Sequence, residues 1–141
     1  MKLLLDTNVF LEVLLRQAHA AGAKEVIANK VGHDLHVSDF SLHSIGLLFV
    51  RRKRHPEFER FLDDLVSNVG ATMVGLQIAQ LATVAKTAAN HKLDFDDAYQ
   101  YTAAELFGLE IVSFDSDFDG TPKGRTPPGD KRLKGALTGA P

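Results

Sequence analysis

The hydrophobic positions of this chain form short apolar runs that alternate with longer segments of helical periodicity. Four runs have the length of a buried strand, and they cover residues 2–5, 35–38, 71–74 and 110–114. Six helical segments lie between or after them, at residues 7–16, 19–29, 40–53, 56–67, 77–91 and 96–107. Helical connections of this length favour parallel strand pairing with right-handed crossovers. The pattern therefore predicts an α/β fold with a short central sheet that helices cover on both faces.

Several helix boundaries have a local cause in the sequence. Thr7 or Asn8 is expected to cap the first helix, and Asp94 is a candidate cap for the helix that starts near residue 96. Pro56 suits the first turn of a helix, and Gly108 is expected to end the last predicted helix.

Acidic residues stand at three places in this pattern, two of them directly after an apolar run. Asp6 comes directly after Leu-Leu-Leu, Asp96 and Asp97 open a helix, and Asp115 and Asp117 follow the fourth strand in IVSFDSDF. In an open parallel sheet, ligands gather beyond the carboxyl ends of the strands, so these side chains are expected at one edge. Converging carboxylates repel one another unless they share protons, have basic neighbours or hold a divalent cation. The spacing indicates a cation site at this edge.

Length and composition limit the classes of protein to which this chain can belong. A chain of 141 residues with 45% hydrophobic and 24% charged residues fits one globular domain. The absence of cysteine excludes disulfides, thiolate nucleophiles and cysteine metal sites. The apolar runs are too short to cross a bilayer and no signal peptide pattern is present, so we expect a cytoplasmic protein without membrane contact.

Charge is distributed unevenly along the chain. Residues 1–118 carry a formal net charge of −5, whereas residues 119–141 carry +3. That tail holds five of the eleven glycines and four of the five prolines, so it is expected to form neither helix nor strand and to extend along the surface or be disordered. It either solubilises the protein or contacts RNA or a partner. The basic run at residues 51–54 could follow an RNA backbone, or it could complement the dipole at a helix C-terminus.

Two segments carry a resemblance to a known family. LLLDTNVFLEVL at the start and DFDDAYQYTAAELFGLEIVSFDSDF later resemble a PIN domain, and more narrowly a VapC-like toxin ribonuclease, over residues 1–118. The resemblance implies a three-layer α/β/α fold with a mainly parallel sheet, a Mg²⁺ or Mn²⁺ site and metal-dependent hydrolysis of RNA. It also implies a homodimer and a cognate antitoxin.

The resemblance assigns roles to the acids. Asp6, Asp97 and Asp115 match the family's catalytic, metal-binding carboxylates, and Asp117 matches an additional acid often found beside them. Asp96 would be a secondary or transient ligand. Thr7 and Asn8 are polar neighbours of Asp6 that could orient it or contact phosphate. For each of these acids, an ordinary helix cap or a solvated strand end is the alternative interpretation.

One departure from the family bears on activity. Family members usually carry a Glu in the helix after the second strand, where this chain reads VSDFSLHSIGLLFVRR with Ser44 at the matching position. Asp39 or His43 could substitute in part, the site could work with three acids, or it could have lost catalysis.

Three hypotheses follow. The first is a metal-dependent endoribonuclease that serves as the toxin of a type II toxin–antitoxin pair. The second is a degenerate PIN domain that binds RNA or a protein without cleaving. The third is a phosphatase or hydrolase with Asp6 as nucleophile, although DTN lacks the usual D-x-D pattern. The sequence leaves open the RNA target, the cleavage site, the antitoxin and the number of metal ions.

Overall fold

The computed structural model describes residues 1–29 and 32–138, and its centre is a four-stranded sheet. The strands are β1 (Lys2–Leu5), β2 (Asp34–Ser38), β3 (Thr72–Val74) and β4 (Glu110–Val112). Their order across the sheet is β3-β2-β1-β4, and each neighbouring pair is parallel. The four predicted strands are thereby confirmed, with β4 ending two residues earlier than expected.

Helices fill the connections between the strands, and one more follows the last strand. They are α1 (Thr7–Leu14), α2 (Ala20–Ala28), α3 (Asp39–Arg51), α4 (His55–Asp64), α5 (Ile78–His91), α6 (Phe95–Phe107) and α7 (Lys131–Thr138). A π-helical turn, η1 (Leu65–Val69), continues α4, and a 3₁₀ turn, η2 (Ser116–Gly120), follows β4. Within residues 1–29 and 32–138, no helix is both long and apolar enough to cross a membrane.

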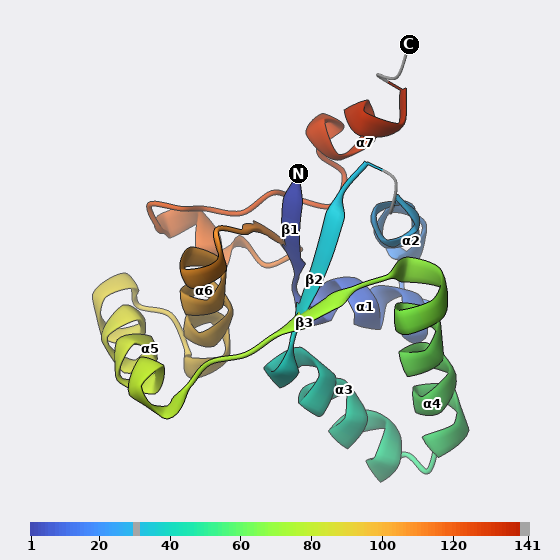
Figure 1. Ribbon diagram of the computed structural model, residues 1–141, viewed down its shortest axis with the longest axis horizontal. Helices are drawn as coiled ribbons and strands as arrows, with labels where there is room; N and C mark the ends of the chain where they lie inside the picture. Colours follow the sequence, from blue (N-terminus) through green and yellow to red (C-terminus); the bar gives the residue numbers. More distant parts are fainter. Residues whose placement is uncertain (30–31, 139–141) are drawn as a thin grey trace.

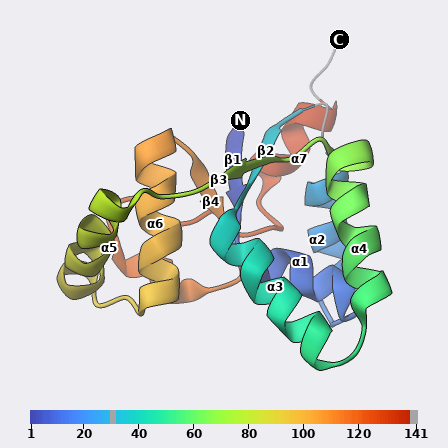
Figure 2. The same cartoon turned by 60° about the horizontal axis from the view of Figure 1, so that its bottom comes forward.

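Helices cover both faces of the sheet (Figures 1 and 2), and the sheet separates two hydrophobic cores, which confirms the three-layer arrangement. Successive side chains of a strand point to opposite faces, so Leu3 and Leu5 join one core and Leu4 joins the other. The first core contains buried residues of α1 to α4, and the second contains buried residues of α5 and α6. All three leucines are at most 1% exposed, because helices cover both faces of β1.

The strand order creates one reversal point. The chain progresses from β1 to β2 and β3 in one direction, then returns to place β4 on the other side of β1. The connections β1–β2 and β2–β3 run over one face and the connection β3–β4 runs over the other (Figure 1). A crevice is expected where such connections diverge, beyond the carboxyl ends of β1 and β4. Asp6 and the residues that follow Val112 lie at this place.

Three of the predicted boundary residues act as expected, and one helix cap was predicted wrongly. Asp94 accepts a hydrogen bond from the Asp97 amide at 2.8 Å, Pro56 lies in the first turn of α4, and Gly108 ends α6 with a left-handed φ of 66°. The cap of α1, however, is Asp6 rather than Thr7 or Asn8, since its carboxylate accepts from the Thr7 amide.

The prediction that residues 119–141 contain neither helix nor strand was wrong. Thr126 forms a parallel bridge with Val112, and its amide donates to the Ile111 carbonyl at 2.7 Å. Helix α7 follows, and Leu133 at its start is only 3% exposed. Most glycines and prolines of this segment lie before residue 130, in the stretch beside the edge of β4. Proline is tolerated at a strand edge because it has no backbone amide that would be left without a hydrogen-bond partner. Residues 139–141 of the predicted tail lie outside the described residues.

Candidate metal centre

Asp6 is the most deeply buried acid at the reversal point of the sheet. It ends β1 and starts α1, and it is 7% exposed. Its Oδ1 accepts from the Thr7 amide at 2.8 Å and from Gln100 Nε2 at 3.0 Å, and its Oδ2 accepts from Ser113 Oγ at 2.7 Å. Burial raises the pKa of Asp6 above its ordinary value, and the charge of Asp115 adds to this effect, while the three hydrogen bonds oppose it.

Ser113 connects the ends of β1 and β4. Its hydroxyl donates to Asp6 and accepts from Asn8 Nδ2 at 3.1 Å and from the Asp115 amide at 2.9 Å. Asn8 in turn accepts from the Phe114 amide through its Oδ1 at 3.2 Å. Asn8 therefore fixes the loop after β4 to α1. Asn8 makes no hydrogen bond to Asp6 itself; it orients Ser113, and Ser113 in turn donates to Asp6.

Asp97 projects from the first turn of α6 into the same region. It is 8% exposed, and the cap formed by Asp94 fixes the start of its helix. Burial raises the pKa of Asp97 to about 8, with further contributions from the negative charges of Asp115, Asp94 and Asp6. A carboxyl group with a pKa near neutrality is typical of functional sites, where like charges are held together.

Asp115 and Asp117 complete a group of acids with Asp97. One carboxylate oxygen from each of the three lies within 4.8 Å of the other two. Asp115 caps η2 by accepting from the Asp117 amide at 2.8 Å, so the backbone turn itself brings these two side chains together. Three carboxylates this close together provide the oxygen donors that hard divalent cations prefer. Asp6 lies outside this close group, but the charge of Asp115 helps to raise the pKa of Asp6, and the charge of Asp6 helps to raise the pKa of Asp97.

The structure places the remaining predicted site residues elsewhere. Asp39 starts α3, where its Oδ1 accepts from Tyr99 Oη at 2.7 Å. This bond and the burial of the phenol raise the pKa of Tyr99 to about 12, with burial the larger cause. His43 and Asp96 are exposed, and Ser44 is half-buried. None of these four is among the grouped acids.

The basic run after α3 is only partly available to a ligand. Arg51 lies in the last turn of α3, where a positive charge complements the helix dipole. Arg54 pairs with Glu57, and its guanidinium lies 4.7 Å from the centre of the Phe49 ring. Arg52 and Lys53 are exposed.

Two residues next to Asp6 were missed by reasoning from the sequence. Ser113 and Gln100 are 0% and 1% exposed, and both donate to Asp6. A signal for Gln100 existed, because it lies three positions after Asp97 and therefore on the same side of a helix. No equivalent signal marks Ser113, whose role depends on the pairing of β4 with β1.

Comparison with known proteins identifies the family. A family model described as PIN domain matches residues 3–124 of this chain. The chain belongs to the PIN domain family, whose members are generally nucleases that use divalent metal ions. Among curated proteins, none matches it in sequence.

Solved structures with the same fold include a VapC toxin and a toxin–antitoxin complex. VapC20 of Mycobacterium tuberculosis, described as a sarcin-ricin loop cleaving toxin, has a TM-score of 0.72 at 18% identity, covering 89% of this chain and 98% of that one. FitAcB from Neisseria gonorrhoeae has a TM-score of 0.68 at 19% identity, covering 91% and 98%. A toxin–antitoxin complex from Klebsiella pneumoniae has a TM-score of 0.67 at 21% identity, covering 89% and 97%. The fold is therefore that of a VapC-like PIN domain.

Proposed function

We propose that this protein is a metal-dependent endoribonuclease and the toxin of a type II toxin–antitoxin pair. One observation carries the proposal, namely the convergence of Asp97, Asp115 and Asp117 beside the buried Asp6 at the reversal point of the sheet. Without a bound cation, repulsion among these acids keeps a proton on Asp97 at neutral pH, and a divalent ion would replace that proton. Membership of the PIN domain family and the VapC-like fold support the same assignment.

The proposed ligands of Mg²⁺ or Mn²⁺ are Asp6, Asp97 and Asp115, with Asp117 and Asp96 as secondary ligands. A divalent ion bound here supplies charge neutralisation for the scissile phosphate and activates water for attack. The protein's own contribution is orientation. The Thr7 amide and Ser113 fix the two oxygens of Asp6, and the turn of η2 fixes Asp115.

A binding-only PIN domain is the second candidate, and the missing Glu motivates it. Ser44 stands where the family's acid is expected, and neither His43 nor Asp39 lies among the grouped acids. Three or four carboxylates still provide enough oxygens for one octahedral ion when water and phosphate complete the shell. A nucleophilic role for Asp6 has less support, because both of its oxygens already accept hydrogen bonds in a buried position.

The deciding experiment is cleavage of a mixed RNA pool by the purified protein in Mg²⁺, Mn²⁺ or EDTA. We expect cutting with either metal, none in EDTA, and a loss of at least roughly 100-fold in Asp6→Asn and Asp115→Asn, since each removes a metal ligand. Asp34→Asn is the matched control, because Asp34 is an exposed acid at the opposite end of the parallel strands. If the folded wild type binds metal but cuts no RNA, the binding-only candidate replaces this proposal.

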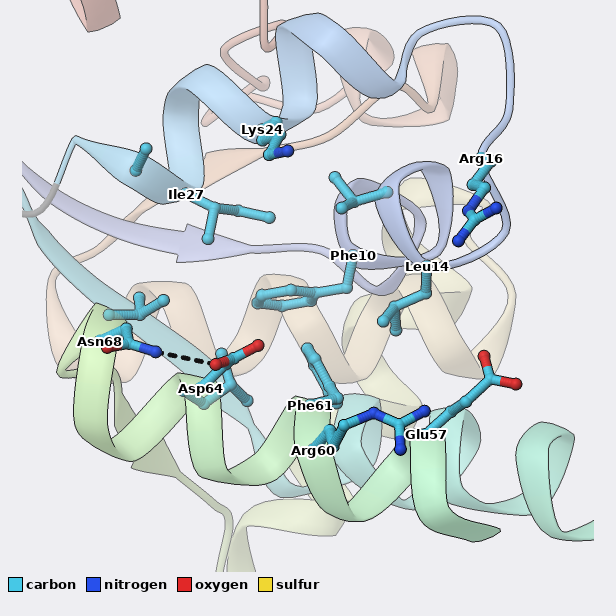
Figure 3. Close-up of a pocket in the computed structure, with 14 residues that line it drawn as sticks. Phe10, Leu14, Arg16, Lys24, Ile27, Glu57, Arg60, Phe61, Asp64 and Asn68 are labelled. Carbon is cyan, nitrogen blue, oxygen red and sulfur yellow. Dashed lines mark hydrogen bonds between the residues drawn. The ribbon is translucent and has the colours of Figure 1, made fainter. Parts of the chain in front are cut away.

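The antitoxin partner has a candidate docking surface. A groove of about 630 Å³ lies between α1, α2 and the α4–η1 segment, far from the grouped acids in sequence (Figure 3). Its walls are apolar side chains: Phe10, Val13, Leu14, Ile27, Phe61 and Leu65. Both signs of charge occur at its rim: Arg16, Lys24, Arg60, Glu57 and Asp64. Such a groove suits an amphipathic segment with several apolar anchors.

We propose that the cognate antitoxin occupies this groove with an amphipathic segment. Two of the similar solved structures are toxin–antitoxin complexes, which supports a partner of this kind. The test is rescue of growth arrest by a candidate antitoxin encoded beside the gene. Leu14→Asp is expected to abolish rescue while RNA cleavage persists, whereas Leu47→Asp, on the exposed side of α3, keeps both. Rescue that survives Leu14→Asp contradicts the assignment.

We further propose a homodimer through the β3 edge and the start of α5. β3 is an edge strand, and Met73, Ile78 and Leu81 near it are 61%, 90% and 39% exposed. Exposed apolar side chains beside an unpaired strand edge are typical of an interface. Light scattering should give twice the mass of one chain, and Ile78→Lys should give a monomer. Val66→Lys, on the π-helical turn, should leave the dimer intact.

A further inference from the structure

Gln100 is a fully buried amide inside the candidate metal centre. It lies on α6, one turn after Asp97, and it is 1% exposed. Its Nε2 donates to Asp6 Oδ1 at 3.0 Å and to Ser41 Oγ at 2.8 Å. Both hydrogens of the amide nitrogen are thereby used, and one of them fixes a metal-centre carboxylate.

The other end of the same amide has no partner. Gln100 Oε1 is buried, and no donor within residues 1–29 and 32–138 reaches it. An unsatisfied buried carbonyl costs roughly 1–3 kcal/mol, a penalty that an apolar side chain of the same size would avoid. Reversing the amide would place its carbonyl oxygen against the Asp6 carboxylate. An ionised carboxylate offers only acceptors, so two hydrogen-bond acceptors would then face each other. The orientation is therefore determined by Asp6, and stability alone does not explain an amide at this position.

Hydroxyl groups occupy the side of the centre that faces α3. Ser41 Oγ lies 2.7 Å from Thr7 Oγ1 and 3.2 Å from Ser38 Oγ. Ser44, where the family carries its Glu, is half-buried one turn further along α3. In this chain α3 therefore meets Asp6 through a neutral polar cluster rather than through a second carboxylate.

We propose that Gln100 is a positioning residue of the metal centre. Its amide fixes Oδ1 of Asp6 while Ser113 fixes Oδ2, so that the carboxylate keeps one orientation toward the cation in the absence of an acid on α3. Groups that orient metal ligands through hydrogen bonds typically change metal affinity or activity by roughly 10–100-fold when they are removed. The inference rests on the proposed function only in taking this centre as a cation site.

The test measures Mn²⁺ affinity of the full chain by electron paramagnetic resonance, in a double-mutant cycle. Gln100→Met keeps the volume and removes the amide, and we expect it to weaken Mn²⁺ binding roughly 10–100-fold. Asp6→Asn should weaken binding as well. Adding Gln100→Met to Asp6→Asn should then change affinity by less than about threefold, because the amide acts through Asp6. Thr102→Val, another buried polar position of α6, should bind Mn²⁺ like the wild type.

The outcomes separate this inference from the proposed ribonuclease activity. Weakened Mn²⁺ binding in folded Gln100→Met with a non-additive double variant supports it even if no RNA is cut. Additive effects, equal loss in Thr102→Val, or unchanged affinity in Gln100→Met would overturn it, as would a wild type that binds no Mn²⁺. If Gln100→Met does not fold, Gln100→Leu replaces it in the cycle, with the same non-additivity required.

Discussion

Replacing Asp97 by asparagine should change how stability depends on pH in the metal-free protein. The pKa of Asp97 is raised to about 8 from an ordinary value of 3.8, by burial first and then by neighbouring carboxylates. Between these two values the folded state holds a proton that the unfolded state has released. The free energy of unfolding therefore falls as pH rises, by about 1.4 kcal/mol per pH unit for this proton. From pH 5.5 to 7.5 the loss amounts to about 2–3 kcal/mol.

Urea denaturation in EDTA at pH 5.5 and 7.5 measures this effect as a difference between variants. The wild type should lose about 2–3 kcal/mol more than Asp97→Asn over the interval, because the amide does not titrate. Groups remote from Asp97 contribute equally to both proteins, whereas the interaction of Asp97 with Asp6 is lost in Asp97→Asn and forms part of the difference. Asp96→Asn, the exposed neighbour on the same helix turn, should retain the wild-type slope. Equal slopes in the wild type and Asp97→Asn would refute the reasoning.

Adding a divalent ion should reverse the trend in the wild type. Ligation requires deprotonated carboxylates, so stabilisation by Mn²⁺ should be larger at pH 7.5 than at pH 5.5. Asp97→Asn removes one of the three grouped acids and should lose most of this stabilisation. Chelation of Mn²⁺ with EDTA should restore the metal-free slope. A wild type whose stability is the same with and without Mn²⁺ at pH 7.5 would contradict a cation site here.

Three further tests use urea denaturation, and two of them compare a substitution with a second one elsewhere in the chain. Ser113→Ala should cost about 1–3 kcal/mol and weaken Mn²⁺ binding, because it leaves buried partners unpaired. Gly108→Ala should destabilise by about 1 kcal/mol at a φ of 66°, whereas Gly22→Ala, inside α2 with open space around it, should stabilise by about 0.5–1 kcal/mol. Leu133→Ala should cost about 2–4 kcal/mol if α7 packs on the core, against less than about 0.5 kcal/mol for the exposed Leu47→Ala. Stabilisation by Gly108→Ala, destabilisation by Gly22→Ala, or equal costs for Leu133→Ala and Leu47→Ala would count against the corresponding assignment.

Local sequence patterns account for most of what could be predicted about the fold. Apolar runs and helical periodicity located the four strands and six helices, since burial on two faces leaves a direct trace in the order of residues. The positions of Asp6 and Asp115 after strands and of Asp97 in the first turn of a helix were also predictable, whereas their role as metal ligands stays a prediction. Composition misled at the C-terminal segment. An average over residues 119–141 could not show that Thr126 would pair with the open edge of β4.

The sequence by itself determined the family, the element order and the identity of the candidate ligands. Only the tertiary structure decided which polar residues surround Asp6, because Gln100 and Ser113 reach it from sequence separations of 94 and 107 residues. It likewise placed Asp39 against Tyr99 and excluded it from the grouped acids. The physical reason is that strand pairing and helix packing set long-range distances, whereas a sequence pattern records only which faces are buried.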